Sequence, residues 1–138
     1  METQILKTES PISNTKSILK ISLENFDLPV LVEDMKETRN WEQGEMDAMV
    51  LLKSPVKKVI LTALPRNTEI DSFQSNDSIT VQVIEGKLKF HTRKVSVLLG
   101  RGQLLTLHQN IKYSMTTFGI KTIFLLTVSG GKVLSGIN

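Results

Sequence analysis

A series of short β-type segments, separated by turn signals, constrains this chain more than any other feature of its sequence. The segments are rich in aliphatic and β-branched residues, and Pro, Gly or polar clusters lie between them. The predicted strands are residues 48–53, 57–64, 79–85, 87–92, 95–99, 103–107, 112–117 and 120–128. Many short strands at a spacing of about 8–12 residues are typical of an all-β sandwich or barrel. We therefore predict an all-β domain of roughly eight strands.

Alternation of apolar and polar residues indicates which strand faces are buried. In segment 79–85, Ile79, Val81 and Val83 share one face. Segment 57–64 differs, because both of its faces are largely apolar from Val59 onwards. Such a strand needs cover on both sides. We expect that cover to be either a helix of the same chain or another subunit.

The first third of the chain has a different composition. Residues 17–23 alternate like a strand, and residues 28–38 carry apolar side chains at helical spacing after Asp27, a good helix cap. Residues 40–47, which are polar apart from Trp41 and Met46, predict a loop. The expected organisation is a flexible N-terminus at 1–16, a strand and helix packed on the barrel at 17–46, and a barrel domain at 47–138. The tail after Gly130 fits either a last edge strand or disorder.

Composition excludes several classes of function. The chain has no cysteine and only two histidines, so thiolate metal sites, disulfides and thiol nucleophiles are impossible. A net charge of +3 and 5% aromatic residues argue against nucleic-acid binding. No apolar run reaches the roughly 18 residues of a membrane span, and the polar start lacks the apolar region of a secretory signal. We expect a cytoplasmic protein that binds neither membranes nor nucleic acid.

Four segments of the sequence resemble the cupin domain, in particular the small single-domain cupins. They are VILTALPRNTEI (59–70), ITVQVIEGKLKF (79–90), LGRGQLLTLHQNIKYSM (99–115) and TIFLLTV (122–128). Gly102 follows Gly86 by 16 residues and precedes Tyr113 by 11, which suits the two cupin motifs. The resemblance implies a cupin-type double-stranded β-helix, a jelly-roll barrel, with a short N-terminal helix. It also implies a homodimer, because small cupins commonly pair.

The resemblance also identifies what this chain lacks. Metal-binding cupins use two His and one Glu of the first motif and one His of the second. The Glu position falls on Ile79 and the last His position on Tyr113, while the first two fall near Phe73 and Ser75, or near Ser72 and Gln74. None of these residues is an imidazole or a carboxylate, which a first-row metal needs. We therefore expect no metal and no cofactor.

The candidate site is the barrel interior around these positions. Tyr113 either directs its hydroxyl at a small ligand or fills the space that a metal would occupy, and Phe73 either stacks on a ligand or plugs the mouth. The predicted interior site consists of Phe73, Ser75, Ile79, Val81, Tyr113 and Met115. Trp41, the only tryptophan, is interpreted as a core anchor or interface residue, with a ligand contact as the alternative.

Three classes of function remain after these arguments. The preferred one is a metal-free, non-enzymatic cupin that binds a small molecule in the barrel or acts as a dimeric structural or sensing module. The second is an enzyme, either a cofactor-independent isomerase or epimerase, or a degenerate metal-dependent cupin. Its base would have to be Glu69, Asp71 or His108, and Tyr113 its acid. The third is an interaction protein that binds through a sheet face.

Overall fold

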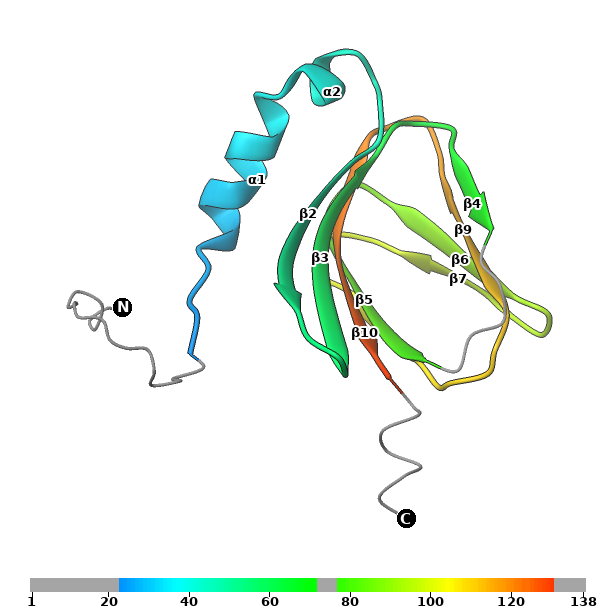
Figure 1. Ribbon diagram of the computed structural model, residues 1–138. Helices are drawn as coiled ribbons and strands as arrows, with labels where there is room; N and C mark the ends of the chain where they lie inside the picture. The colour runs from blue at the N-terminus through cyan, green and yellow to red at the C-terminus, as the bar shows by residue number, and fades with distance from the viewer. Residues whose placement is uncertain (1–22, 72–76, 131–138) are drawn as a thin grey trace. The chain divides into compact units, whose positions relative to one another are not determined.

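The computed structural model describes residues 23–71 and 77–130 (Figure 1). Its helices and strands are, in chain order, α1 (Leu28–Lys36), α2 (Arg39–Glu42), β2 (Asp47–Lys53), β3 (Lys57–Leu64), β4 (Glu69–Asp71), β5 (Ser78–Glu85), β6 (Leu88–Thr92), β7 (Ser96–Leu99), β8 (Leu104–Leu107), β9 (Tyr113–Thr117) and β10 (Thr122–Ser129). The chain divides into two units at Leu31–Val32, within α1. All of the strands belong to the second unit.

The strands form two antiparallel sheets that face each other (Figure 1). The first sheet has the strand order β2-β3-β10-β5-β8, and the second has the order β4-β9-β6-β7. Strands far apart in the sequence are neighbours, since β10 lies between β3 and β5. This is the jelly-roll arrangement that the sequence predicted, and it has a short helix before the strands.

The core lies between the two sheets and is built by alternation. Ile79, Val81 and Val83 of β5 are each at most 4% exposed, and Gln82 between them is exposed. Phe124 of β10 lies opposite Val83 in the register, so both side chains point to the same face. The second sheet contributes Leu88 and other apolar side chains to the same cluster. The alternation predicted for 79–85 is therefore what the structure has.

The second half of strand β3 is buried on both faces within this chain. On the face away from the core, Leu61, Ala63 and Ile123 of β10 are almost completely buried. Glu85 pairs with Ile123 across the sheet and holds Lys36 at the end of α1. Helix residues Val32 and Met35 are 3% and 1% exposed. Of the two covers that the sequence allowed, these buried helix residues and the contact between Lys36 and Glu85 favour the helix.

Two short elements differ from the sequence prediction. The predicted loop at 40–47 begins with α2, which Thr38 caps by accepting a hydrogen bond from the Trp41 N–H at 3.2 Å. One helical turn is too short to display the 3.6-residue period, so only the cap signals it. The stretch at Glu69–Asp71, which is not among the predicted strands, is strand β4, which pairs with β9. Three residues likewise give too little alternation to predict a strand.

The predicted helix at 28–38 agrees with α1 to within two residues, and Asp27 caps it through the Val30 N–H at 3.4 Å. The predicted strand at 17–23 lies outside the described residues, apart from an exposed Leu23. Phe73, Ser75 and the tail after Gly130 lie outside them too. Among the helices in the described ranges, none has the length and apolar character needed to span a bilayer.

Candidate functional site

The described members of the predicted interior site come together in the core. Ile79 and Val81 of β5 and Met115 of β9 are 4%, 0% and 4% exposed, and they belong to one apolar cluster. Tyr113 is half-buried at the edge of that cluster. Its ring stacks on Phe90 of β6, with a centroid distance of 5.0 Å and an interplanar angle of 18°. In the described part of the chain, these side chains are packed against one another.

The environment of Tyr113 keeps its hydroxyl protonated. Burial raises the pKa of Tyr113 above its ordinary value of 10.0, and the negative charge of Asp77 raises it further. Asp77 precedes β5 and was not singled out in the sequence, because its approach to Tyr113 depends on the packing of β5 against β9. At neutral pH the phenol is therefore an uncharged side chain that can donate or accept a hydrogen bond.

These residues do not fit a divalent metal ion. Ile79 offers no donor atom, and the neutral phenol of Tyr113 is a poor substitute for imidazole or carboxylate. Their neighbours Phe90 and Met115 add an aromatic ring and a thioether, which hard and borderline cations do not favour. Within residues 23–71 and 77–130, no three His, Asp or Glu side chains gather closely enough to hold a metal.

The acid–base candidates do not face Tyr113. Ile70 of β4 packs on the core beside Met115, so Glu69 and Asp71 on either side of it point to the opposite face of the sheet. Tyr113 has the core-facing orientation of Met115, two residues away. His108 is exposed after β8. Glu69 and Asp71 are therefore not placed as bases against Tyr113.

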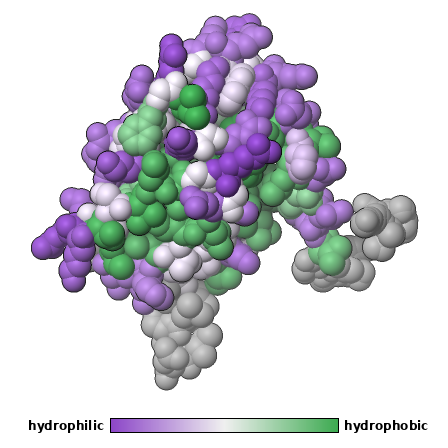
Figure 2. Space-filling view, turned by 180° about the vertical axis from the view of Figure 1, so that it is seen from behind, coloured by the Kyte–Doolittle hydropathy of each residue, from purple (hydrophilic) through white to green (hydrophobic). Residues whose placement is uncertain are grey.

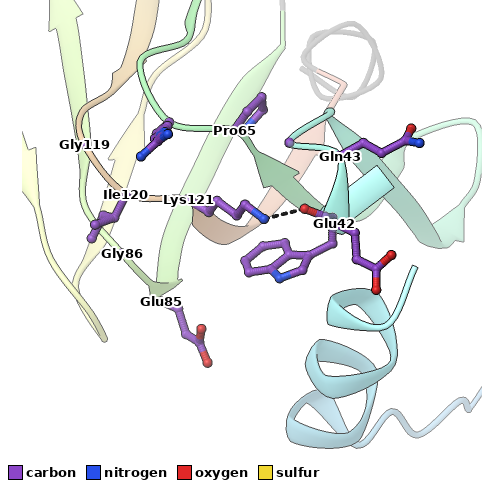
Figure 3. Close-up of a pocket in the computed structure, with 11 residues that line it drawn as sticks. Glu42, Gln43, Pro65, Glu85, Gly86, Gly119, Ile120 and Lys121 are labelled. Carbon is purple, nitrogen blue, oxygen red and sulfur yellow. Dashed lines mark hydrogen bonds between the residues drawn. The ribbon is translucent and has the colours of Figure 1, made fainter. Parts of the chain in front are cut away.

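A pocket of about 820 Å³ lies at the end of the sheets where β5 ends and β10 begins. Four chain segments meet there: α2, the turn after β3, the turn after β5, and the turn before β10. Its lining residues are Trp41, Glu42, Gln43, Gly44, Pro65, Arg66, Glu85, Gly86, Gly119, Ile120 and Lys121 (Figure 3). We call this cavity the Trp41 pocket. No described residue of the predicted interior site lines it.

Contacts between Trp41 and Lys121 form one wall of the Trp41 pocket. The Lys121 ammonium donates a hydrogen bond to the carbonyl oxygen of Trp41 (Figure 3) and lies 4.5 Å from the centre of the indole ring. A cation over an indole face is attracted by the ring quadrupole. Trp41 is thus held by Lys121, just before β10, and by the Thr38 cap. It lines a pocket, as the ligand-contact alternative requires.

Gly86 lies where the turn after β5 meets the turn before β10. Its φ of +93° is a conformation that favours glycine, and a Cβ there would lie 2.6 Å from the Lys121 carbonyl oxygen. The Thr122 hydroxyl donates to the Lys87 carbonyl at 2.9 Å and accepts from the Lys87 N–H at 3.2 Å. These contacts fix the turn after β5 against the start of β10.

Glu85 is neutralised at the rim of the same pocket. The Lys36 ammonium lies 2.8 Å from each of its carboxylate oxygens. The hydrogen bond to Glu85 is the main cause that raises the pKa of Lys36, so Lys36 is charged at neutral pH. The positive charges of Arg66 and Lys121 therefore outweigh the acidic side chains in the remaining lining, where Glu42 is the other carboxylate.

Comparison with known proteins identifies the fold. No model of a known family matches the sequence, and no curated protein matches it either. The Cnp3 cupin domain of Schizosaccharomyces pombe is similar in structure, with a TM-score of 0.61 and 12% identity, over 67% of this chain and 69% of that one.

A cupin 2 conserved barrel domain protein from Leptotrichia buccalis has a TM-score of 0.62 and 15% identity, over 70% of this chain and 45% of that one. The DMSP lyase DddQ from Ruegeria pomeroyi has a TM-score of 0.56 and 13% identity, over 62% and 47%. The similar structures thus include an enzyme. At these identities the likeness concerns the fold and not the chemistry.

Proposed function

We propose that this chain, which has the cupin fold, is a metal-independent and non-catalytic module that acts as a homodimer. One observation carries the proposal: the stacked Phe90–Tyr113 pair packs with Ile79, Val81 and Met115 where a metal-binding cupin has its ligands. A core of this kind stabilises the fold by excluding water. It supplies neither a Lewis acid nor a base.

The placement of Glu69 and Asp71, two of the bases that the sequence offered, supports the non-catalytic part of the proposal. General acid–base catalysis requires a base within hydrogen-bond reach of the reacting group. Glu69 and Asp71 lie on the other face of their sheet from Tyr113, as the alternation around Ile70 requires. The isomerase or epimerase alternative would therefore need a large rearrangement of β4.

Thermal stability in the presence of divalent cations tests metal independence. Binding to the folded state raises the melting temperature by mass action. We expect Mn²⁺, Fe²⁺, Ni²⁺ and Zn²⁺ to leave the melting temperature of the tag-free protein unchanged. Tyr113→His is the matched variant, because it restores one imidazole at the second-motif position. A saturable rise for the natural protein would overturn the proposal.

The homodimer is supported by two of the four edge strands of the sheets, β7 and β8. In the described part of the chain, β7 pairs only with β6, and β8 only with β5. Leu98 and Leu104 on these strands are 54% and 60% exposed. Figure 2 shows apolar side chains gathered across the middle of the face seen from behind. Exposed edge strands are usually protected, and a second copy can pair with them by two-fold symmetry.

Light scattering during gel filtration tests the dimer. We expect twice the chain mass for the natural protein, and a shift to monomer for Leu104→Lys. Met46→Lys is the matched control, because Met46 is 52% exposed just before β2 and should leave the mass unchanged. A monomer at all accessible concentrations would refute this part of the proposal.

Binding of a small molecule in the interior is a second candidate, and the half-buried position of Tyr113 supports it. A phenol at the edge of an apolar core can give a ligand one oriented hydrogen bond. A thermal-shift screen of small acids, sugars and aromatic compounds tests the idea. Any hit that binds there should lose its shift in Tyr113→Phe and keep it in Arg66→Gln.

A further inference from the structure

We propose that the Trp41 pocket binds a small organic anion, a carboxylate with a flat or apolar body, at Arg66 and Lys121. The site lies apart from the core residues discussed above, and the proposal does not depend on the proposed function. It is carried by the charges in the lining, the apolar surface beside them and the rigidity of the turns.

The charge balance of the pocket favours an anion. Its four charged groups are Arg66, Lys121, Glu42 and Glu85, and the last is held by Lys36 through both oxygens at 2.8 Å. In residues 23–71 and 77–130, no carboxylate forms an ion pair with Arg66 or Lys121. Figure 3 shows the Glu42 carboxylate directed away from the Lys121 ammonium.

The donors for an anion are of the right type. An ammonium has three N–H donors, and that of Lys121 gives one to the Trp41 carbonyl oxygen. The Arg66 guanidinium can present two parallel N–H groups to one carboxylate. Charge-assisted hydrogen bonds of this kind are stronger than neutral ones. The bound group should therefore be ionised, and an uncharged amide of the same shape should bind much more weakly.

Apolar surface beside these cations suits the body of an organic acid. Trp41, Pro65 and Ile120 all line the pocket, and Ile120 is 50% exposed. An exposed isoleucine in the lining loses water favourably when a flat or apolar group covers it. An inorganic anion would bind to the two cationic side chains but would leave this apolar surface exposed to water. The lining therefore favours an aryl or alkyl carboxylate over phosphate.

The pocket is held in shape before a ligand arrives. The turn containing Gly86 touches the Lys121 backbone, and the Thr122 hydroxyl bonds both backbone groups of Lys87. Lys121 in turn holds Trp41. A site whose walls are already fixed loses little conformational entropy on binding. This arrangement distinguishes the Trp41 pocket from a chance depression between mobile loops.

The single tryptophan provides a direct test. A ¹⁵N-labelled protein gives one indole N–H signal, which reports on Trp41 alone. Benzoate and benzamide, its uncharged analogue, are titrated at constant ionic strength into the full chain. We expect benzoate to shift the indole signal saturably and benzamide to bind at least about tenfold more weakly, as expected when a charge-assisted contact is lost.

Variants connect this signal to the proposed residues. Arg66→Gln and Lys121→Gln should each weaken benzoate binding about tenfold or more. The controls are Arg101→Gln and Lys112→Gln, exposed residues outside the pocket, which should leave it unchanged. A saturable shift that is equal for benzamide, or that survives Arg66→Gln in a folded protein, would overturn the proposal. So would the absence of any benzoate-dependent shift.

Discussion

Replacement of Phe90 by alanine tests whether the space between the sheets is packed core. Phe90 is 1% exposed and stacks on Tyr113 at 5.0 Å. Replacing a buried phenylalanine by alanine lowers the free energy of unfolding by about 3–5 kcal/mol. Stacking of two aromatic rings contributes about 0.5–1.5 kcal/mol to the stability beyond the burial of their surface. A domain with a total stability of about 5–15 kcal/mol would lose roughly a fifth or more of it.

The assay is urea unfolding followed by far-ultraviolet circular dichroism. The control is Phe118→Ala, which makes the same chemical change at a side chain that is 38% exposed and should cost about 1 kcal/mol or less. If the slope of the unfolding free energy against urea concentration is unchanged, both variants unfold from a native state of the same compactness. If the two variants cost the same, Phe90 lines a space that was already open, and the packed-core interpretation is wrong.

Three other properties follow from particular contacts. The pKa of Tyr113 in the folded state is raised above 10.0, so the contribution of its protonated hydroxyl to the stability is complete below pH 10.0 and declines as the pH rises towards the folded pKa. Near-ultraviolet titration of this single tyrosine should therefore give a higher pKa in the native protein than in urea. Gly86→Ala should destabilise by about 1–3 kcal/mol more than Gly102→Ala in the same unfolding assay, because both have positive φ but only at Gly86 does a Cβ meet backbone atoms. Thr117→Val should cost about 1–3 kcal/mol on urea unfolding, because it removes the donor to the Pro65 carbonyl at 2.6 Å, whereas exposed Thr106→Val should cost about 0.5 kcal/mol or less.

Much of the fold could be predicted because its signals are local. Segment 57–64 matches β3 at both ends, and the segments predicted for β5 to β9 match to within one residue. In each, alternating apolar residues bounded by Gly, Pro or polar clusters determine both the strand and its buried face. Ile79 and Val81, predicted to share a face, share the core.

The Trp41 pocket could not be predicted, since its walls come from four segments far apart in the sequence. Trp41 and Lys121 stand 80 positions apart, and neither lies in a recognisable motif. The weak local signals were the Thr38 cap, which positions Trp41, and Gly86, which permits a close approach to Lys121. Only the order of strands β3, β10 and β5 brings these residues together.

The prediction of what covers β3 was limited for the same reason. The sequence required apolar cover for both faces of 57–64, but period and composition could not distinguish a helix of the chain from a second subunit. The ion pair between Lys36 and Glu85, 49 positions apart, is a contact that favours the helix. Long-range pairings of this kind have no signature in a single sequence.

Metal stoichiometry by plasma mass spectrometry, on protein purified without a histidine tag, tests the central claim most directly. Packing of Tyr113 on Phe90 beside Ile79 leaves no set of donors for a cation. We predict iron, manganese, nickel and zinc contents far below one ion per chain. A content near one ion per chain, retained after dialysis against a weak chelator, would contradict the account.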